Sequence, residues 1–196
     1  MDRASDSRAP WLDPLFRCPA QLDLFYGAPE IISGCNGGSC SSLVMLEAAT
    51  ARIRDIYPRV RGGVVCMLSA AQIHRLSSTG EGALWLGVPL RVHVPRRDPS
   101  SLRILRWSNR TAFEVGVEEV GFDEITIRCT TPERTVVDLL RYGRHLGGLA
   151  TAAQCLRAYT ASGGDHKAIR DIADAVRVPH AARLILDALL SAGGPS

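Results

Sequence analysis

The sequence predicts an α+β fold: a short helix, then a small mixed or antiparallel sheet, then a C-terminal group of about four helices. Two observations predict it. The strand-like segments are gathered between residues 84 and 129, and the segments after residue 130 have the apolar spacing of helices. Strands and helices that are segregated along the chain are typical of α+β proteins, whereas a doubly wound parallel sheet alternates them. The 196 residues, 46% of them hydrophobic, are enough to bury a core.

Residues 1–42 are expected to be an irregular, poorly ordered segment. A glycine- and serine-rich run at residues 33–42 follows a proline-rich part. Proline and glycine interrupt regular secondary structure, and at this spacing they leave little room for a helix or a long strand. The prolines are Pro10, Pro14, Pro19 and Pro29. A helix is predicted from Leu43 to Tyr57 because its apolar residues recur on one face, and Pro58 ends it.

The central part of the chain is predicted to hold one helix and several strands. The helix is expected over Cys66–Leu76, and Leu90, Val92 and Val94 alternate with polar residues as they do in a strand. A hairpin is expected to turn at residues 121–123. The further strand candidates are Leu102–Trp107, Phe113–Val117 and Ile125–Cys129.

Four helices are predicted in the C-terminal third. Thr131 is placed to cap the first, with Pro132 at its first position and Glu133 in its first turn, where the helix dipole favours an acid. The second covers Leu149–Tyr159. The third begins after Asp165 and the fourth at Pro179.

Charge and composition exclude several classes of function. The net charge is +3, too mild to indicate nucleic acid by itself, and every base except Lys167 is an arginine. A P-loop is absent, and most lysine-dependent chemistry is excluded. The longest apolar stretch, Ala83–Leu90, is far shorter than the ~20 residues of a membrane span. Without an apolar segment near the N-terminus we expect no signal peptide and a cytoplasmic protein. No cofactor signature is present, so no cofactor is expected.

Two arginine clusters are candidate partner-binding surfaces. The first consists of Arg91, Arg96, Arg97, Arg103, Arg106 and Arg110, and the second of Arg52, Arg54, Arg59 and Arg61. An acidic stretch, residues 114–124, follows the first cluster, so one hypothesis is that the two stretches pair across a sheet. The other is that the arginines bind an acidic partner or DNA phosphates, which arginine recognises through paired hydrogen bonds. For the second cluster, the alternative to DNA contact is a solvated helix end.

Candidate catalytic and metal sites are few. The six cysteines form no CxxC pair, and zinc needs four ligands, so no metal site is expected. Ser69 and His74 lie five residues apart on one short helix and point in different directions, so they form no nucleophile–base pair. A less favoured hypothesis is a nuclease-like site with a divalent ion, and it lacks a supporting lysine. Its carboxylates would be Glu114, Glu118 or Asp123.

Two segments, residues 62–76 and 130–147, together resemble the C-terminal domain of the AbiEi family, bacterial antitoxins of type IV toxin–antitoxin and abortive-infection systems. The similarity includes Ser69-Ala70 and His74 in the first segment and the Trp85–Pro89 sequence after it. It also includes the core motif of the second segment, whose residues are Thr131, Pro132, Glu133, Arg134, Thr135, Val136, Val137 and Asp138.

This resemblance implies a non-enzymatic antitoxin or transcriptional regulator that counters a nucleotidyltransferase-like toxin. The domain would cover residues 61–196, and the motif residues would be structural, with Asp138 turned inward beside Arg134 or Arg141. An N-terminal winged helix-turn-helix that binds operator DNA is also implied. Residues 43–60 contain one helix and a linker, which we interpret as a remnant of that region. The alternative is a DNA-binding repressor with a degenerate N-terminal reader.

Overall fold

The computed structural model describes residues 50–77, 82–94, 101–122, 125–143 and 149–192. The irregular segment predicted for residues 1–42 and the first part of the helix predicted from Leu43 lie outside the described residues. The described part of that helix covers residues 50–56, and the 3-10 turn η2 (Tyr57–Arg59), which contains Pro58, follows it. Among the described residues no helix is both long and apolar enough to cross a bilayer.

The elements follow the predicted α+β order. Strand β1 (Val64–Val65) leads directly into helix α2 (Met67–Ile73), and strands β2 (Leu84–Pro89) and β3 (Leu102–Trp107) come next. The 3-10 helix η3 (Arg110–Phe113) precedes the hairpin of β4 (Val117–Phe122) and β5 (Ile125–Thr130). The C-terminal helices are α3 (Pro132–Tyr142), α4 (Leu149–Ala161), α5 (His166–Ala175) and α6 (His180–Ala192). The predicted C-terminal helical group is therefore confirmed.

Within the described residues, five strands form one mixed sheet in the order β3-β2-β1-β5-β4. The outer pairs differ: β2 and β3 run parallel, whereas β4 and β5 form an antiparallel hairpin. A hairpin was predicted here, but Gly121 and Phe122 of its expected turn belong to β4, where they pair with Thr126 and Ile125. The centre is made by β1, antiparallel to β2 and parallel to β5. Strand β1 has only two residues, too few to show the alternation of apolar and polar residues that marks a strand, so the sequence did not predict it.

Two strand predictions were wrong. The alternating residues Leu90, Val92 and Val94 follow β2 rather than forming a strand, because the chain turns at residues 90–91. The segment Phe113–Val117 is also not a strand. Asn109 caps η3 there by accepting a hydrogen bond from the Thr111 amide, and Gly116 has a positive φ of 61°.

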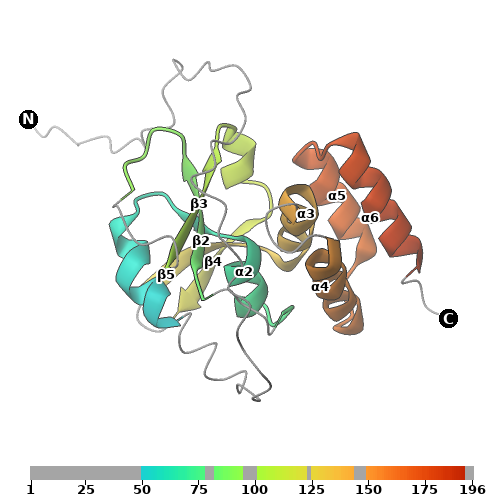
Figure 1. Ribbon diagram of the computed structural model, residues 1–196, viewed down its shortest axis with the longest axis horizontal. Coiled ribbons are helices and arrows are strands. Elements are labelled where there is room, and N and C mark those ends of the chain that lie inside the picture. Colours follow the sequence, from blue (N-terminus) through green and yellow to red (C-terminus); the bar gives the residue numbers. More distant parts are fainter. Residues whose placement is uncertain (1–49, 78–81, 95–100, 123–124, 144–148, 193–196) are drawn as a thin grey trace, which may run out of the picture.

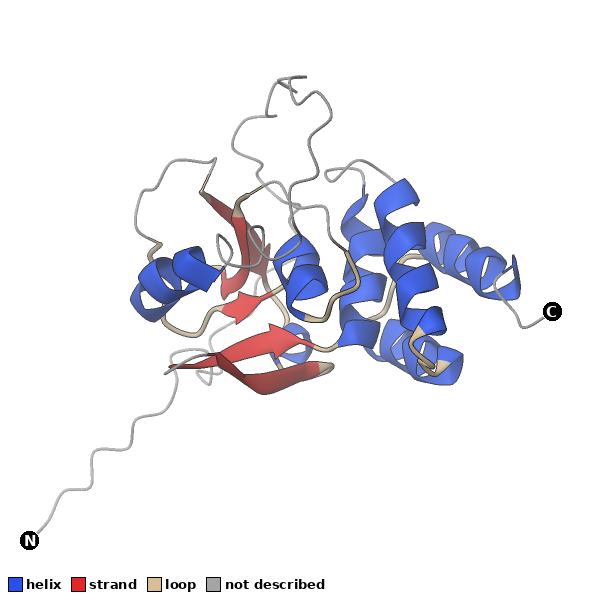
Figure 2. Cartoon of the chain, turned by 90° about the horizontal axis from the view of Figure 1, so that it is seen from below, coloured by secondary structure: helices blue, strands red, loops and turns tan. Residues whose placement is uncertain are grey.

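The sheet separates two hydrophobic clusters, and neighbouring strand residues alternate between them. Val64 and Trp85 belong to the cluster that contains α3 to α6, whereas Val65 and Leu86 belong to the cluster that contains Ile53 of the first helix. In Figure 1 residues 50–56 lie to the left of the sheet and α3 to α6 to its right, and Figure 2 shows the strands between the same two groups. The helical group thus packs as a body on one side of the sheet.

The hypothesis that the arginine-rich and acidic stretches pair across the sheet was wrong. β3 and β4, which carry much of the two stretches, lie at opposite edges of the described sheet. Three strands separate them because β2, β1 and β5 insert between them. One contact joins the stretches locally, an exposed ion pair of 2.6 Å between Arg110 Nε and Glu114 Oε1.

Replacing Gly87 of β2 with alanine is expected to lower the free energy of unfolding by about 1–3 kcal/mol. A Cβ at this position would lie 2.5 Å from Cη2 of Trp107. The indole cannot move aside easily, because it is buried and packs edge-to-face on Phe113 with 5.1 Å between ring centroids. Thermal unfolding followed by circular dichroism tests this, with a shift of roughly 2–4 °C for each kcal/mol. The matched control is Gly121→Ala in β4, where a Cβ meets no described atom within 4 Å.

Candidate functional site

The strand-to-helix junction between β5 and α3 carries the motif that the sequence singled out. The Thr131 side chain accepts a hydrogen bond of 3.3 Å from the Arg134 amide, with Pro132 in the first turn, so the predicted cap is confirmed. Glu133 is in the first turn, as predicted, and its Oε1 accepts a bond of 2.8 Å from the Tyr159 hydroxyl of α4. The junction therefore fixes both the start of α3 and its contact with α4.

A buried ion pair lies one turn further along α3. Arg134 Nε donates to Asp138 Oδ2 at 2.9 Å, and the two side chains are 1% and 0% exposed. Arg134 Nη1 also donates to the Val115 carbonyl at 2.6 Å, and the guanidinium lies 5.4 Å from the centre of the Trp107 ring. Burial raises the pKa of the Asp138 carboxyl, although Arg134 and Arg141 act against that shift. This arrangement anchors α3 to the loop that precedes β4.

Further polar contacts link the junction to α2. Thr135 Oγ1 lies 2.8 Å from the hydroxyl of Thr130, the last residue of β5. His74, at the end of α2, donates through Nε2 to the Thr130 carbonyl at 2.6 Å. The same nitrogen lies 3.7 Å from Cys129 Sγ and 3.9 Å from Glu118 Oε1. Because Nε2 carries the proton in this hydrogen bond, it is not available to activate the thiol.

Ser69 contacts a different strand from His74. Its hydroxyl donates to the Ala83 carbonyl at 3.3 Å and accepts from the Trp85 amide at 2.9 Å, which holds the start of β2 against α2. Its bonding partners thus lie at β2, whereas His74 bonds to β5. The motif residues as a group are inside the domain and are engaged in contacts between elements.

The structure separates the predicted arginines into several groups. Arg106 Nη1 donates to the carbonyls of Pro89, Leu90 and Val92, and so binds the segment after β2. Arg110 pairs with Glu114, and Arg59 pairs with Asp55 at 2.8 Å. The remaining positions are as follows: Arg54, Arg61 and Arg91 are exposed, Arg52 and Arg103 are half-buried, and Arg96 and Arg97 lie outside the described residues.

The carboxylates of the nuclease hypothesis are not brought together in the described structure. Glu114 is bound to Arg110, and Glu118 lies beside His74 on β4. Asp123 lies outside the described residues. Across the described ranges, no group of three or more histidine, cysteine, aspartate or glutamate side chains is placed to hold a metal ion.

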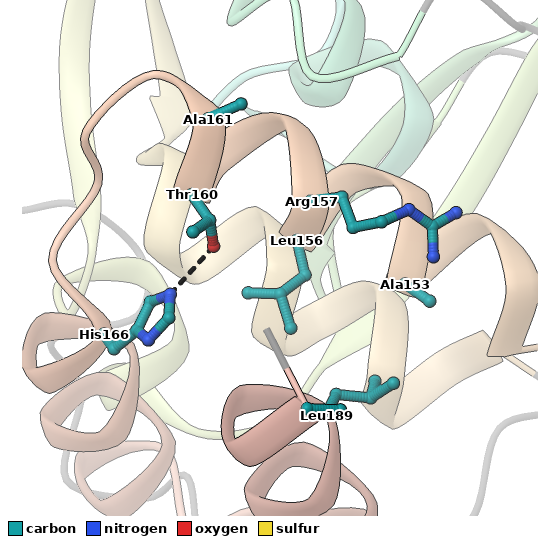
Figure 3. A pocket seen from close by; sticks show the side chains of 8 residues that line it. Ala153, Leu156, Arg157, Thr160, Ala161, His166 and Leu189 are labelled. Carbon is teal, nitrogen blue, oxygen red and sulfur yellow. Dashed lines mark hydrogen bonds between the residues drawn. The ribbon is translucent and has the colours of Figure 1, made fainter. Parts of the chain in front are cut away.

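The sequence did not predict a groove on the C-terminal helices. It has a volume of about 330 Å³ and lies between α4 and α6, next to the first residue of α5 (Figure 3). Its lining is mostly apolar, with a hydrogen bond of 2.8 Å between Thr160 and His166 Nε2. The lining residues are Ala153, Leu156, Arg157, Thr160, Ala161, His166, Leu189 and Ala192. The sequence spacing shows which residues share a helix face but not that two faces leave a space between them.

The buried thiols are expected to resist alkylation in the native protein. Burial, with a smaller effect of Glu118, raises the pKa of Cys129 to about 12. Since the thiolate is the reactive form, its fraction at pH 8 is roughly 10³-fold below that of an unfolded cysteine with a pKa of about 8.5. Peptide mass spectrometry after iodoacetamide treatment, in buffer and in urea, measures the two rates. Alkylation of Cys129 at equal rates in both would contradict the expectation.

Comparison with known proteins agrees with the motif. The family model described as the AbiEi antitoxin C-terminal domain matches residues 63–188, which include all strands and helices from β1 to α5 and most of α6. No curated protein matches the chain. The match spans well over half of the chain and contains the β5–α3 junction with its buried Arg134–Asp138 pair. The chain therefore belongs to the family of the AbiEi antitoxin C-terminal domain, which supports a role as an antitoxin in abortive infection.

Proposed function

We propose that the protein is a non-enzymatic antitoxin of a type IV toxin–antitoxin system and that it counters a nucleotidyltransferase-like toxin. The family match over residues 63–188 carries this proposal. The geometry supports it in one respect: the motif side chains are used to fix α3 against the sheet and α4. These contacts use the motif side chains in the framework of the domain, which supports the non-enzymatic part of the proposal.

Coexpression with the candidate toxin, a nucleotidyltransferase-like protein that the proposal expects to be encoded by a neighbouring gene, tests the proposal. Induction of the toxin alone is expected to stop growth, and coexpression of this chain is expected to restore it. A toxin inactivated at its catalytic carboxylates gives the baseline for the burden of expression. Full growth arrest despite abundant, folded antitoxin would overturn the proposal.

A DNA-binding repressor is a second candidate, favoured by one observation. Arg54, Arg59 and Arg61 are exposed around the end of the helix that covers residues 50–56. Gel shifts on the upstream DNA of the gene, at two salt concentrations and against an unrelated duplex, test it. Specific binding that weakens steeply with salt is expected, since phosphate contacts release counterions. Arg61→Gln should reduce the salt slope by about one. A flat salt response or equal binding to both duplexes would exclude this candidate.

A further inference from the structure

The two faces of the sheet are covered to different extents. Helices α3 to α6 contribute buried side chains to the cluster on one face. On the other face the described structure places one short helix, residues 50–56 (Figure 1), with Ala70 of α2 beside it. Two hydrophobic side chains on the edge strands of this face, Ile104 of β3 and Val120 of β4, stay half-buried. The second face is therefore covered at its centre and incompletely covered at its edges.

The chain enters the described structure on the β2–β3 side of this face. The start of the helix lies beside the segment that leads into β2, because a Cβ added to Gly82 would be 3.4 Å from Nη2 of Arg52. Strand β3 runs parallel to β2, so the two strands start at the same end of the sheet. After the helix, the Tyr57 hydroxyl accepts a hydrogen bond of 2.8 Å from the Arg128 amide of β5. The helix thus crosses from the β2–β3 side to β5, and the chain that precedes it joins at the β2–β3 side.

The preceding sequence carries apolar side chains that suit the incompletely covered edge. It contains two apolar runs, Trp11–Phe16 and Leu22–Tyr26, each with two aromatic residues. Segments that stay disordered are poor in aromatic residues, so this composition favours packing. Residues 27–42 can span about 50 Å when extended, at ~3.3 Å per residue. A domain of about 150 residues has a radius of gyration of only about 15 Å, so both runs are within reach of β3.

The charges of the segment and of this edge are opposite. Residues 11–26 contain the carboxylates of Asp13 and Asp23 and a single base, Arg17. On the edge, Arg52 lies at the start of the helix, and Arg106 is exposed on β3 two residues after Ile104. Residues two apart on a strand point to the same face, so Arg106 and Ile104 share a side of the sheet. An acidic segment with apolar anchors is the occupant that this combination of charge and apolar surface favours.

We propose that residues 11–26 of this chain pack on the β3 side of the face, with apolar side chains against Ile104 and carboxylates beside Arg52 and Arg106. The segment completes the second hydrophobic cluster as α3 to α6 complete the first. Its prolines interrupt a helix or a strand but do not prevent side-chain packing. Because the segment is tethered, its effective concentration at the surface is on the order of mM without any partner. The inference goes beyond the antitoxin function and does not depend on it.

The cysteines of the N-terminal part provide a reporter with internal controls. Cys18 lies between the two apolar runs, whereas Cys35 and Cys40 lie in the glycine- and serine-rich run outside them. In the reduced full-length protein we expect iodoacetamide to alkylate Cys18 several-fold more slowly than Cys35 and Cys40, and all three at similar rates in urea. Peptide mass spectrometry measures the rates. Trypsin is a second reporter, expected to cleave after Arg17 more slowly than after Arg8, which lies outside the segment.

The decisive variant is Ile104→Glu, with Val120→Glu as its matched control. Both place a carboxylate at a half-buried hydrophobic position on an edge strand of the same face, but β3 and β4 lie at opposite edges of the described sheet. We expect Ile104→Glu to raise the alkylation rate of Cys18 to that of Cys35, and Val120→Glu to leave Cys18 protected. A second variant, Phe16→Ser, should release the segment while every described residue is kept. Circular dichroism and thermal unfolding verify that each variant is folded.

Three outcomes would overturn the proposal. The first is alkylation of Cys18 in the native wild type as fast as that of Cys35 and Cys40, with cleavage after Arg17 as fast as after Arg8. The second is equal release of the segment by folded Ile104→Glu and Val120→Glu variants, because the contact would then not be at the β3 edge. The third is a dimer by light scattering whose dissociation on dilution removes the protection of Cys18, because the segment would then belong to a second copy of the chain.

Discussion

Replacing Asp138 with alanine is expected to lower the free energy of unfolding by about 3–5 kcal/mol, the typical cost of breaking a buried ion pair from one side. The Arg134 guanidinium, 1% exposed, would keep its charge and lose the acceptor that lies 2.9 Å from Nε. The Val115 carbonyl would remain as its hydrogen-bond partner at 2.6 Å, without a compensating negative charge. Urea unfolding at pH 7, followed by far-ultraviolet circular dichroism, measures the change.

The matched control for this variant is Asp171→Ala. Lys167 and Asp171 have the same spacing of four residues, but their side chains are 78% and 62% exposed. Solvent screens such a pair, so its loss should leave the unfolding midpoint almost unchanged. Equal effects of the two substitutions would mean that burial of the Arg134–Asp138 pair is not what stabilises the β5–α3 junction.

Elements with a local physical cause were predictable from the sequence. The cap at Thr131, the proline in the first turn of α3 and the Asp165 cap of α5 each depend on residues within a few positions of one another. The C-terminal helices have apolar residues at helical spacing, and several of those residues are buried, for example Ile169 and Leu139. The turn before β4 was missed because it depends on the positive φ of Gly116, which a run of strand-forming residues hides.

Features that depend on contacts between distant segments were not predictable. Arg106 was predicted to bind a partner. In the structure its guanidinium instead donates to backbone carbonyls fourteen to seventeen residues earlier in the chain. The opposite charges near β3 and β4 suggested pairing, but the order of a sheet is set by its connections, and β1 and β5 meet at its centre. The groove likewise needs the packing of α4 against α6, which no single helix pattern contains.

Replacing Gly116 with alanine is expected to lower the free energy of unfolding by about 2–4 kcal/mol, because a left-handed backbone and a steric clash act together. The φ of Gly116 is 61°. A Cβ there would lie 2.7 Å from Cβ of Arg134, an atom fixed to α3 rather than the flexible end of a side chain, and 3.1 Å from Cδ1 of Ile172. The backbone would have to shift, although the Gly116 carbonyl accepts a bond of 2.9 Å from the Thr131 amide.

Gly163→Ala separates the two causes. Gly163 has a φ of +83°, and a Cβ there meets no described atom within 4 Å. Alanine at this position should therefore lower the free energy of unfolding only through the strain of the left-handed backbone, by about 1 kcal/mol. The difference between the two variants in urea unfolding then measures the clash with Arg134. If Gly116→Ala lowers the free energy of unfolding no more than Gly163→Ala does, the loop before β4 can shift away from Arg134 without a loss of stability. If the clash dominates, Gly116 is required because α3, with its buried ion pair, packs directly against the turn.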